Sequence, residues 1–334
     1  MGISKVLFLV FCLFQLHSCQ FFSSKEESSS NTDTSVQPIE ASYLQFDENL
    51  AYNYIDKQVS FGPRVPSTVG HKACAEWILT TLKEMTDTAY IQEFESITYD
   101  SKKHKGKNII AKLNSKNPTR ILLCAHWDTR PIADHDPKNP TGPILGANDA
   151  GSGVGVILAL LQNFKEKPIT LGIDIVFFDL EDYGQPENSG LTPMENSWCL
   201  GSQYWAKNTK HEFLPRWGIL LDMVGGKDAT FLKEETSMNY ASNLVNRVWS
   251  HGQKLGFEKH FRGESSSVID DHVYINKLAG IPTIDIIHYK LNNGGFADYW
   301  HTHDDNMSSV DKSTLKAVGK TLLNTIYEED KYMQ

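Results

Sequence analysis

The sequence predicts one α/β domain of three layers, in which helices flank a central, mixed but mostly parallel β-sheet. Two observations lead to this prediction. Short apolar runs typical of buried strands alternate with amphipathic helical segments along most of the chain, and such alternation is characteristic of a mostly parallel sheet covered on both faces. The chain also has 334 residues, 40% of them hydrophobic, which is enough for a sizeable core.

The expected elements follow one another in a regular order. Apolar residues recur at helical spacing in the two N-terminal segments, and the next two segments are short β-type runs joined by a turn at Asn117-Pro118. A helix with a glycine-rich start, two buried strands, a long amphipathic helix, a strand opened by Pro282 and a C-terminal helix complete the domain. These elements are helix 51–58, helix 71–85, strand 109–113, strand 120–125, helix 150–163, strand 173–178, strand 217–221, helix 240–255, strand 281–287 and helix 311–327.

The N-terminus predicts export and a lipid anchor. Residues 1–18 begin with the basic Lys5 and continue in a short apolar run, as a secretory signal peptide does. The segment Leu16-His17-Ser18-Cys19 resembles a bacterial lipobox, which implies cleavage before Cys19 and lipidation of that residue. Gln20 favours the outer membrane, by analogy with enteric sorting. We therefore expect an exported protein on the periplasmic side, anchored to the membrane by its lipid.

The composition of the mature chain indicates a tether followed by a domain, and it excludes one class of partner. The polar, serine-rich segment 19–40 is expected to be a flexible tether, which leaves a folded domain over 41–334. Acidic residues outnumber basic ones, 41 against 32. Because nucleic-acid binding needs a cationic surface, we expect no nucleic-acid partner. Beyond the tether the chain has Cys74, Cys124 and Cys199, which allow at most one disulfide.

Residues that can bind a metal or transfer a proton follow the predicted strands. In sheets of this kind the functional site lies beyond the carboxyl ends of the strands. A single aspartate there is usually a turn or helix cap, but several His, Asp and Glu positions at one edge are not explained in this way. Mixed histidine and carboxylate ligands suit catalytic zinc. The positions are His126, Asp128, Asp149, Asp179, Glu181, Asp182, Asp222, His301, His303, Asp304 and Asp305.

These segments resemble the zinc-dependent peptidase family M28 and, within it, the bacterial branch of the glutaminyl cyclases. The resemblance implies a zinc aminopeptidase-like fold and a cyclotransferase that converts N-terminal glutamine of peptides or proteins to pyroglutamate with release of ammonia. The resembling segments span nearly the whole domain in the family's order. They are Phe61-Gly-Pro-Arg64, His126-Trp-Asp-Thr-Arg130, Gly146-Ala-Asn-Asp149, Phe177-Phe-Asp-Leu-Glu181-Asp182, Leu221-Asp222, Asp270-Asp271-His272 and Trp300-His301-Thr-His-Asp-Asp-Asn306.

The resemblance also implies a role for each matching residue. It implies that the zinc ligands are Asp149, Asp182 and His301 and that the general acid/base is Glu181. It also implies that Asp222 and Asp270 are the acidic pair that completes the hydrogen-bond network. The aromatic substrate walls would be Trp198 and Trp300. His303 could exchange roles with His301, although the Trp-His-Thr pattern favours His301. We expect supporting or loop roles for His272, His303, Asp304 and Asp305, because metal-bound histidines need hydrogen-bonding partners.

Two other functions stay open. In two-zinc aminopeptidases of the family, the positions of His126 and Asp222 help to bind the second metal, and metal-bound water attacks the substrate. A cyclase instead needs the α-amine of the substrate free as the nucleophile. We therefore expect one zinc per chain for a cyclase, two for an aminopeptidase, and a monomer. The further alternative is a non-catalytic zinc-binding domain, although Glu181 is present.

Overall fold

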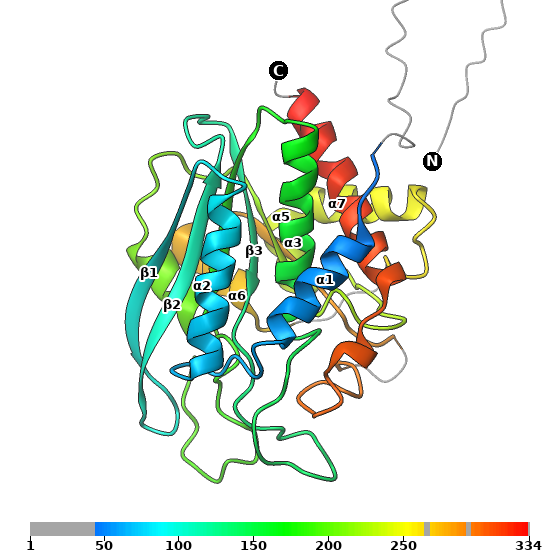
Figure 1. Ribbon diagram of the computed structural model, residues 1–334. Helices are drawn as coiled ribbons and strands as arrows, with labels where there is room; N and C mark the ends of the chain where they lie inside the picture. The colour runs from blue at the N-terminus through cyan, green and yellow to red at the C-terminus, as the bar shows by residue number, and fades with distance from the viewer. Residues whose placement is uncertain (1–43, 264–267, 292–294, 333–334) are drawn as a thin grey trace, which may run out of the picture. The chain divides into compact units, whose positions relative to one another are not determined.

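A six-stranded sheet with the order β1-β2-β4-β3-β5-β6 forms the middle layer (Figure 1). The two pairs that involve β2 are antiparallel, whereas the pairs β4–β3, β3–β5 and β5–β6 are parallel. This arrangement confirms the predicted mixed, mostly parallel sheet. The strands are β1 Thr88–Ile97, β2 Lys103–Leu113, β3 Arg120–His126, β4 Gly172–Phe178, β5 Gly218–Asp222 and β6 Thr283–Ile287.

The computed structural model describes residues 44–263, 268–291 and 295–332, which belong to one compact unit. The expected signal peptide, the expected lipidation site Cys19 and the expected tether lie outside the described residues. Within the described ranges, no helix combines the length and the apolar composition that a membrane span requires. Cys74, Cys124 and Cys199 are buried and free, so no disulfide links these three.

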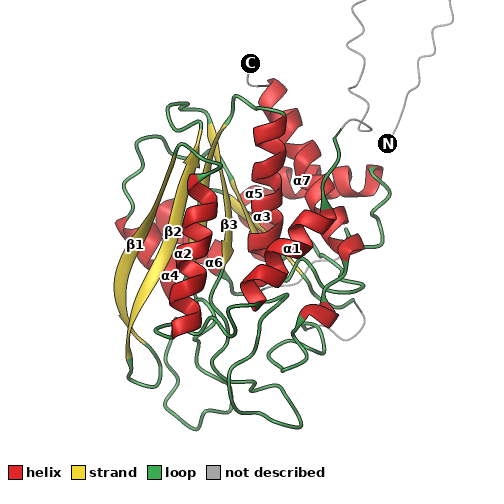
Figure 2. Ribbon diagram, in the orientation of Figure 1, coloured by secondary structure: helices red, strands yellow, loops and turns green. Residues whose placement is uncertain are grey.

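The helices divide between the two faces of the sheet (Figure 2). Ile121 and Leu123 of β3 belong to the larger core, which also includes residues of α1, α2, α3, α5 and α7. The alternate residues Leu122 and Cys124 pack on the opposite face with Trp205 of α4. The helices are α1 Glu48–Val59, α2 Val69–Lys83, α3 Gly151–Glu166, α4 Leu200–Asn208, α5 Glu235–Lys254, α6 Asp271–Tyr274 and α7 Lys312–Tyr332, with a π-helical turn at Ile275–Ala279 and a 3-10 turn at Met307–Ser309.

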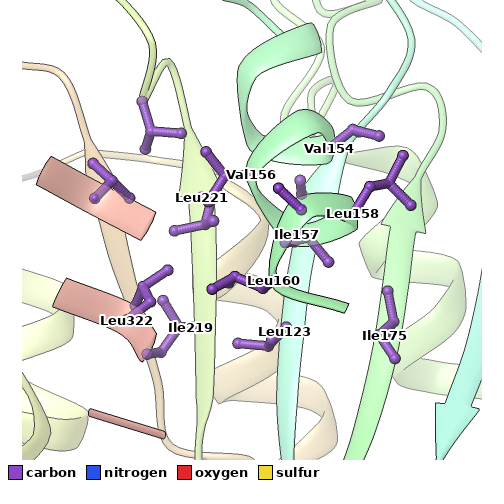
Figure 3. Close-up of a cluster of buried hydrophobic side chains, with 14 of the residues drawn as sticks. Leu123, Val154, Val156, Ile157, Leu158, Leu160, Ile175, Ile219, Leu221 and Leu322 are labelled. Atoms are coloured by element: carbon purple, nitrogen blue, oxygen red, sulfur yellow. The ribbon is translucent and has the colours of Figure 1, made fainter. Parts of the chain in front are cut away.

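Helix α3 is the centre of the larger core. Its apolar side chains pack on β3, β4 and β5, and Leu322 of α7 lies in the same cluster (Figure 3). Full burial of one such side chain contributes about 1.5–3 kcal/mol. At the start of the helix, a Cβ atom on Gly153 would collide with the carbonyl oxygen of Leu221 in β5. The glycine-rich start therefore lets α3 approach the sheet closely, which places the loop before it, including Asp149, at the strand ends.

Three elements were not expected from the sequence: β1, α4 and the short α6. β1 is an edge strand with one buried residue, Phe94, so it lacks the continuous apolar run of the central strands. The turn at Asn117-Pro118 joins β2 to β3, yet these strands are not neighbours, because β4 lies between them. Every expected helix and strand is present, although the ends differ by up to six residues, as at β2, which begins at Lys103.

Candidate active site

A cavity of about 390 Å³ opens beyond the carboxyl ends of the parallel strands. Long loops gather at this edge of the sheet (Figure 2). Of the residues predicted to bind metal or substrate or to transfer protons, all but His126 line this cavity, and His126 lies directly behind three of the lining residues. The residues that line it include Asp149, Glu181, Asp182, Trp198, Asp222, Asp270, Trp300 and His301, together with the apolar Met223, Val268, Ile269, Ile287 and Phe296.

Asp149, Asp182 and His301 form one candidate metal centre. Their ligand atoms all lie within 4.8 Å of one another. Nε2 of His301 is 3.1 Å from Oδ1 of Asp182 and 3.9 Å from Oδ2 of Asp149. Burial, together with the nearby Asp149 carboxylate, raises the pKa of Asp182 to about 6, and Oδ2 of Asp182 is buried without a hydrogen-bond partner among the described residues. A divalent cation would relieve the repulsion between the carboxylates of Asp149 and Asp182, so this set of ligand atoms fits zinc.

A second candidate group shares Asp149 with the first. Nε2 of His126 lies 2.8 Å from Oδ1 of Asp149 and 3.1 Å from Oδ1 of Asp222. Burial alone would lower the pKa of His126, but the carboxylates of Asp128, Asp149 and Asp222 raise it well above its usual value. The group therefore accommodates either a second metal ion or a protonated His126 that pairs with the two carboxylates.

Glu181 follows the end of β4 and reaches the cavity with a side chain that is 12% exposed. Its Oε2 lies 3.6 Å from Nδ1 of His126, and its Oε1 accepts a hydrogen bond from the thiol of Cys199 at 3.2 Å. Burial raises the pKa of Glu181 well above its usual value, and the carboxylates of Asp270 and Asp182 add to this effect. A carboxyl group with a raised pKa can take up and release protons near neutral pH.

Asp128 holds the turn that carries both Glu181 and Asp182. Its carboxylate oxygens accept the backbone N–H of Glu181 at 3.1 Å and that of Asp182 at 3.3 Å. Asp179, which precedes this turn, accepts hydrogen bonds from His71 and from the backbone of Lys107, away from the cavity. The two functional carboxyl groups thus project from a backbone that buried aspartates keep in place.

The loop before α3 is held by a third buried aspartate. The carboxylate of Asp305 accepts the backbone N–H of Asn148 at 2.8 Å and that of Asp149 at 3.0 Å. The neighbouring His303 is instead hydrogen-bonded to Asp136 at 2.9 Å and belongs to no candidate metal group among the described residues. Of the two histidines that could have exchanged roles, the structure therefore brings His301 to Asp149 and Asp182.

Two tryptophan rings lie close to His301. The ring of Trp300 stacks on the imidazole with centroids 3.6 Å apart, and that of Trp198 lies nearly parallel to it at 5.9 Å. The guanidinium of Arg130 lies over the Trp198 ring at 4.5 Å, a cation–π contact. The two tryptophans thus form apolar walls directly beside the candidate metal centre.

Asp270 borders the cavity from the start of α6. Its Oδ1 accepts the backbone N–H of Asp271, and its Oδ2 is buried without a partner among the described residues. Behind it, the buried His272 contacts Glu234 at 3.0 Å and lies 3.7 Å from Asp285. His272 is thus a supporting residue behind Asp270 and does not reach the cavity.

Sequence reasoning did not assign functions to several residues that hold the site together. Asp128 and Arg130 belong to a motif that the sequence displays, but their hydrogen bonds cross to the loop after β4, and no spacing along the chain indicates such contacts. Asp134 and Cys199 carry no motif at all. A single buried polar residue in a loop has no periodic signal, so only the fold reveals its partner.

The chain resembles zinc-dependent enzymes of known structure over most of its length. The model of peptidase family M28 matches residues 108–326. Glutaminyl cyclase of Bacteroides thetaiotaomicron, solved with N-acetylhistamine, is 46% identical, with a TM-score of 0.82 over 85% of this chain and 98% of that chain. A Zn-dependent exopeptidase from Parabacteroides distasonis is also 46% identical, with a TM-score of 0.82 over 85% of this chain and 99% of that chain.

A curated relative with lower identity is also a glutaminyl cyclase. Glutaminyl-peptide cyclotransferase of Drosophila melanogaster is 28% identical over 285 residues, which are 75% of this chain and 73% of that protein. Together with the family match, the sheet order and the residues at the strand ends, these similarities show that the chain belongs to peptidase family M28.

Proposed function

We propose that the protein is a zinc-dependent glutaminyl-peptide cyclotransferase. It would convert the N-terminal glutamine of peptides or proteins to pyroglutamate and release ammonia. The observation that carries this proposal is the placement of Glu181, a carboxyl group with a raised pKa, in one cavity with the group of Asp149, Asp182 and His301 and with two tryptophans. The similar bacterial enzymes described above include the glutaminyl cyclase of Bacteroides thetaiotaomicron, at 46% identity.

Asp149, Asp182 and His301 would hold the zinc ion, one per chain. When bound, the ion would act as a Lewis acid toward the γ-carbonyl oxygen of the substrate glutamine. The ligands come from three separate loops at the edge of the sheet, and Asp128, Asp305 and the core under α3 fix these loops. The protein therefore provides a rigid set of donors before the substrate arrives.

Glu181 would transfer the proton that the reaction has to move. The α-amine of the substrate attacks the γ-amide carbon, a C–N bond forms, and the C–N bond to the departing ammonia breaks. Glu181 takes a proton from the attacking amine and returns it to the leaving nitrogen, so it ends in its starting state. General acid/base catalysis of this kind contributes roughly 10²–10⁴-fold to the rate.

Asp270, Asp222 and the tryptophans would position the substrate. The free Oδ2 of Asp270 can accept a hydrogen bond from the substrate amine. Burial and the nearby Asp149 raise the pKa of Asp222 to about 7, so near neutral pH this group can either donate or accept. Trp198 and Trp300 would hold the flexible glutamine side chain in a ring-like conformation, which lowers the entropic part of the barrier.

An M28 aminopeptidase is the second candidate, because the group of His126, Asp149 and Asp222 could bind another metal ion. The deciding experiment measures ammonia release from Gln-Ala peptides beside hydrolysis of leucine anilide, with zinc counted per chain. We expect ammonia release, little anilide hydrolysis and one zinc. Anilide hydrolysis with two zinc ions and no ammonia would contradict the cyclase and establish the aminopeptidase.

We also propose that the mature protein is anchored on the periplasmic side of the membrane through lipid on Cys19. The support is the lipobox-like segment and the polar stretch between Cys19 and the domain. Replacing the cysteine, as in Cys19→Ala, should release an active enzyme from the membrane fraction. A variant that stays in the membrane fraction would contradict the lipid anchor.

A further inference from the structure

The side chain of Glu181 touches Cys199, a residue from a different loop. The Sγ atom of Cys199 lies 3.2 Å from Oε1 of Glu181. We infer that Cys199 is a positioning residue, whose thiol holds the carboxyl group of Glu181 in the orientation needed for proton transfer. This inference rests on the proposed role of Glu181 as the general acid/base.

Two hydrogen bonds connect the residues, so the contact does not depend on one rotatable side chain. Besides the thiol contact, the backbone N–H of Cys199 donates to the carbonyl oxygen of Glu181 at 3.0 Å. The next backbone N–H, that of Leu200, donates to the carbonyl of Leu180 at 3.0 Å. The start of α4 is thus paired with the turn after β4, and the thiol is fixed relative to the carboxyl group.

Cys199 adopts a backbone conformation that favours this contact. Its φ is +58°, in the left-handed region that is unfavourable for residues with a Cβ atom. The residue is fully buried and lies directly before α4. Such a conformation persists only where the surrounding structure enforces it. The thiol of the residue held in this conformation contacts Glu181, while the preceding Trp198 forms part of the cavity wall.

The thiol can act only as a donor toward a carboxylate. Burial raises the pKa of the Cys199 thiol well above its usual value, and the carboxyl group of Glu181 adds to this effect. The sulfur therefore keeps its proton and donates it to Oε1, as a weak hydrogen-bond donor. Oε2 is then the oxygen that lies near His126, at 3.6 Å from Nδ1. Cys199 thus binds Oε1 and leaves Oε2 as the oxygen without a thiol contact.

The test compares Cys199→Ala and Cys199→Ser with the wild-type enzyme. Loss of one weak donor to a carboxylate should lower kcat by about three- to tenfold in Cys199→Ala, with KM and zinc content unchanged. Serine restores a donor, so Cys199→Ser should recover a large part of this loss. Cys124→Ala is the matched control, since its buried thiol contacts the carbonyl of Ile219 and lies away from the cavity.

Each outcome decides the inference. An unchanged kcat in Cys199→Ala, an equal loss in Cys124→Ala, or a loss that serine does not relieve would overturn it. Both ammonia release and leucine anilide hydrolysis are measured for every variant. A wild-type enzyme that hydrolyses only the anilide would overturn the cyclase proposal. The ratio of kcat in Cys199→Ala to kcat in the wild type, measured for anilide hydrolysis, would still decide the role of Cys199. A wild-type enzyme with neither activity would overturn both.

Discussion

Nδ1 of His301 lies 3.3 Å from Oδ1 of Asp134. Arg130 holds this carboxylate with two donors, Nε to Oδ1 at 3.0 Å and Nη2 to Oδ2 at 2.7 Å. The same buried guanidinium donates through Nη1 to the backbone carbonyls of Asp182 and Gly184. One arginine therefore fixes both the carboxylate partner of His301 and the loop that carries Asp182. His301 and Asp182 are two of the three residues of the candidate metal centre.

Removing the charge of Asp134 should weaken zinc binding. A carboxylate on the outer nitrogen of a metal-bound histidine orients the ring and increases its basicity, and loss of such a partner typically costs 10–100-fold in metal affinity. We expect a decrease of about this size for Asp134→Asn, measured by competition with a chelator of known affinity. Asp136→Asn is the control, since Asp136 contacts His303 instead. Equal zinc affinities for wild type and Asp134→Asn would contradict this role.

Replacing Glu181 by glutamine should separate chemistry from metal binding. Glu181→Gln keeps the shape of the side chain but cannot transfer a proton, so kcat should fall by about 10²–10⁴-fold. Zinc content should not change, because Glu181 is outside the group of Asp149, Asp182 and His301. Glu93→Gln, on the exposed side of β1, is the control. Full activity of Glu181→Gln in a steady-state ammonia assay would remove Glu181 from the mechanism.

Variants of Asp149 and Asp222 distinguish an enzyme that binds one zinc ion from an enzyme that binds two. Asp149 belongs to both candidate groups, whereas Asp222 belongs only to the group with His126. If the enzyme uses one zinc, Asp149→Asn should lose it, and Asp222→Asn should retain one zinc per chain although its turnover falls. Elemental analysis of the purified proteins measures this directly. Wild-type protein with two zinc ions, of which Asp222→Asn loses one, would contradict the single-zinc prediction.

The central strands could be predicted from the sequence because both of their faces are buried. Every residue of β3, β4, β5 and β6 is buried, so these strands are mostly apolar, although Asp174 and Asp285 interrupt β4 and β6. Parallel strands in one layer also bring their carboxyl ends together, which is why His126, Glu181 and Asp222 could be expected at one edge. The edge strand β1 alternates between partly buried and exposed residues and carries a much weaker signal.

The supporting contacts could not be predicted, since each depends on where a loop returns to the site. Arg130 and Asp134 are four residues apart, a separation that also occurs on a helix surface, yet here they lie in a loop and reach toward His301. Likewise, Cys199 is separated from Glu181 by 18 residues. The order of β2, β4 and β3 in the sheet also follows from packing, because the chain connection alone suggests that β2 and β3 are neighbours.

His288, just after β6, should make the protein less stable in mild acid. It is buried, only 5% exposed, and its Nδ1 has no hydrogen-bond partner among the described residues. Burial, aided by Lys290 and His260, lowers its pKa from 6.5 to about 4. Below pH 6.5 the unfolded state therefore binds a proton that the folded state excludes. The free energy of unfolding therefore decreases as the pH falls from about 6.5 to about 4. Below that range the loss caused by His288 no longer grows.

The pKa shift of His288 gives the size of its effect on stability and a way to test it. At 1.36 kcal/mol per pKa unit, the histidine costs up to about 3 kcal/mol at low pH. His288→Leu removes the titrating group and keeps an apolar side chain in the buried position. In urea unfolding, wild type should lose more stability than His288→Leu between pH 7.5 and 4.5, since all other groups titrate alike in both proteins. Between pH 7.5 and 8.5 the imidazole is neutral in both states, so the two proteins should respond equally. Identical losses below pH 6.5 would show that water or a proton already reaches His288 in the folded protein.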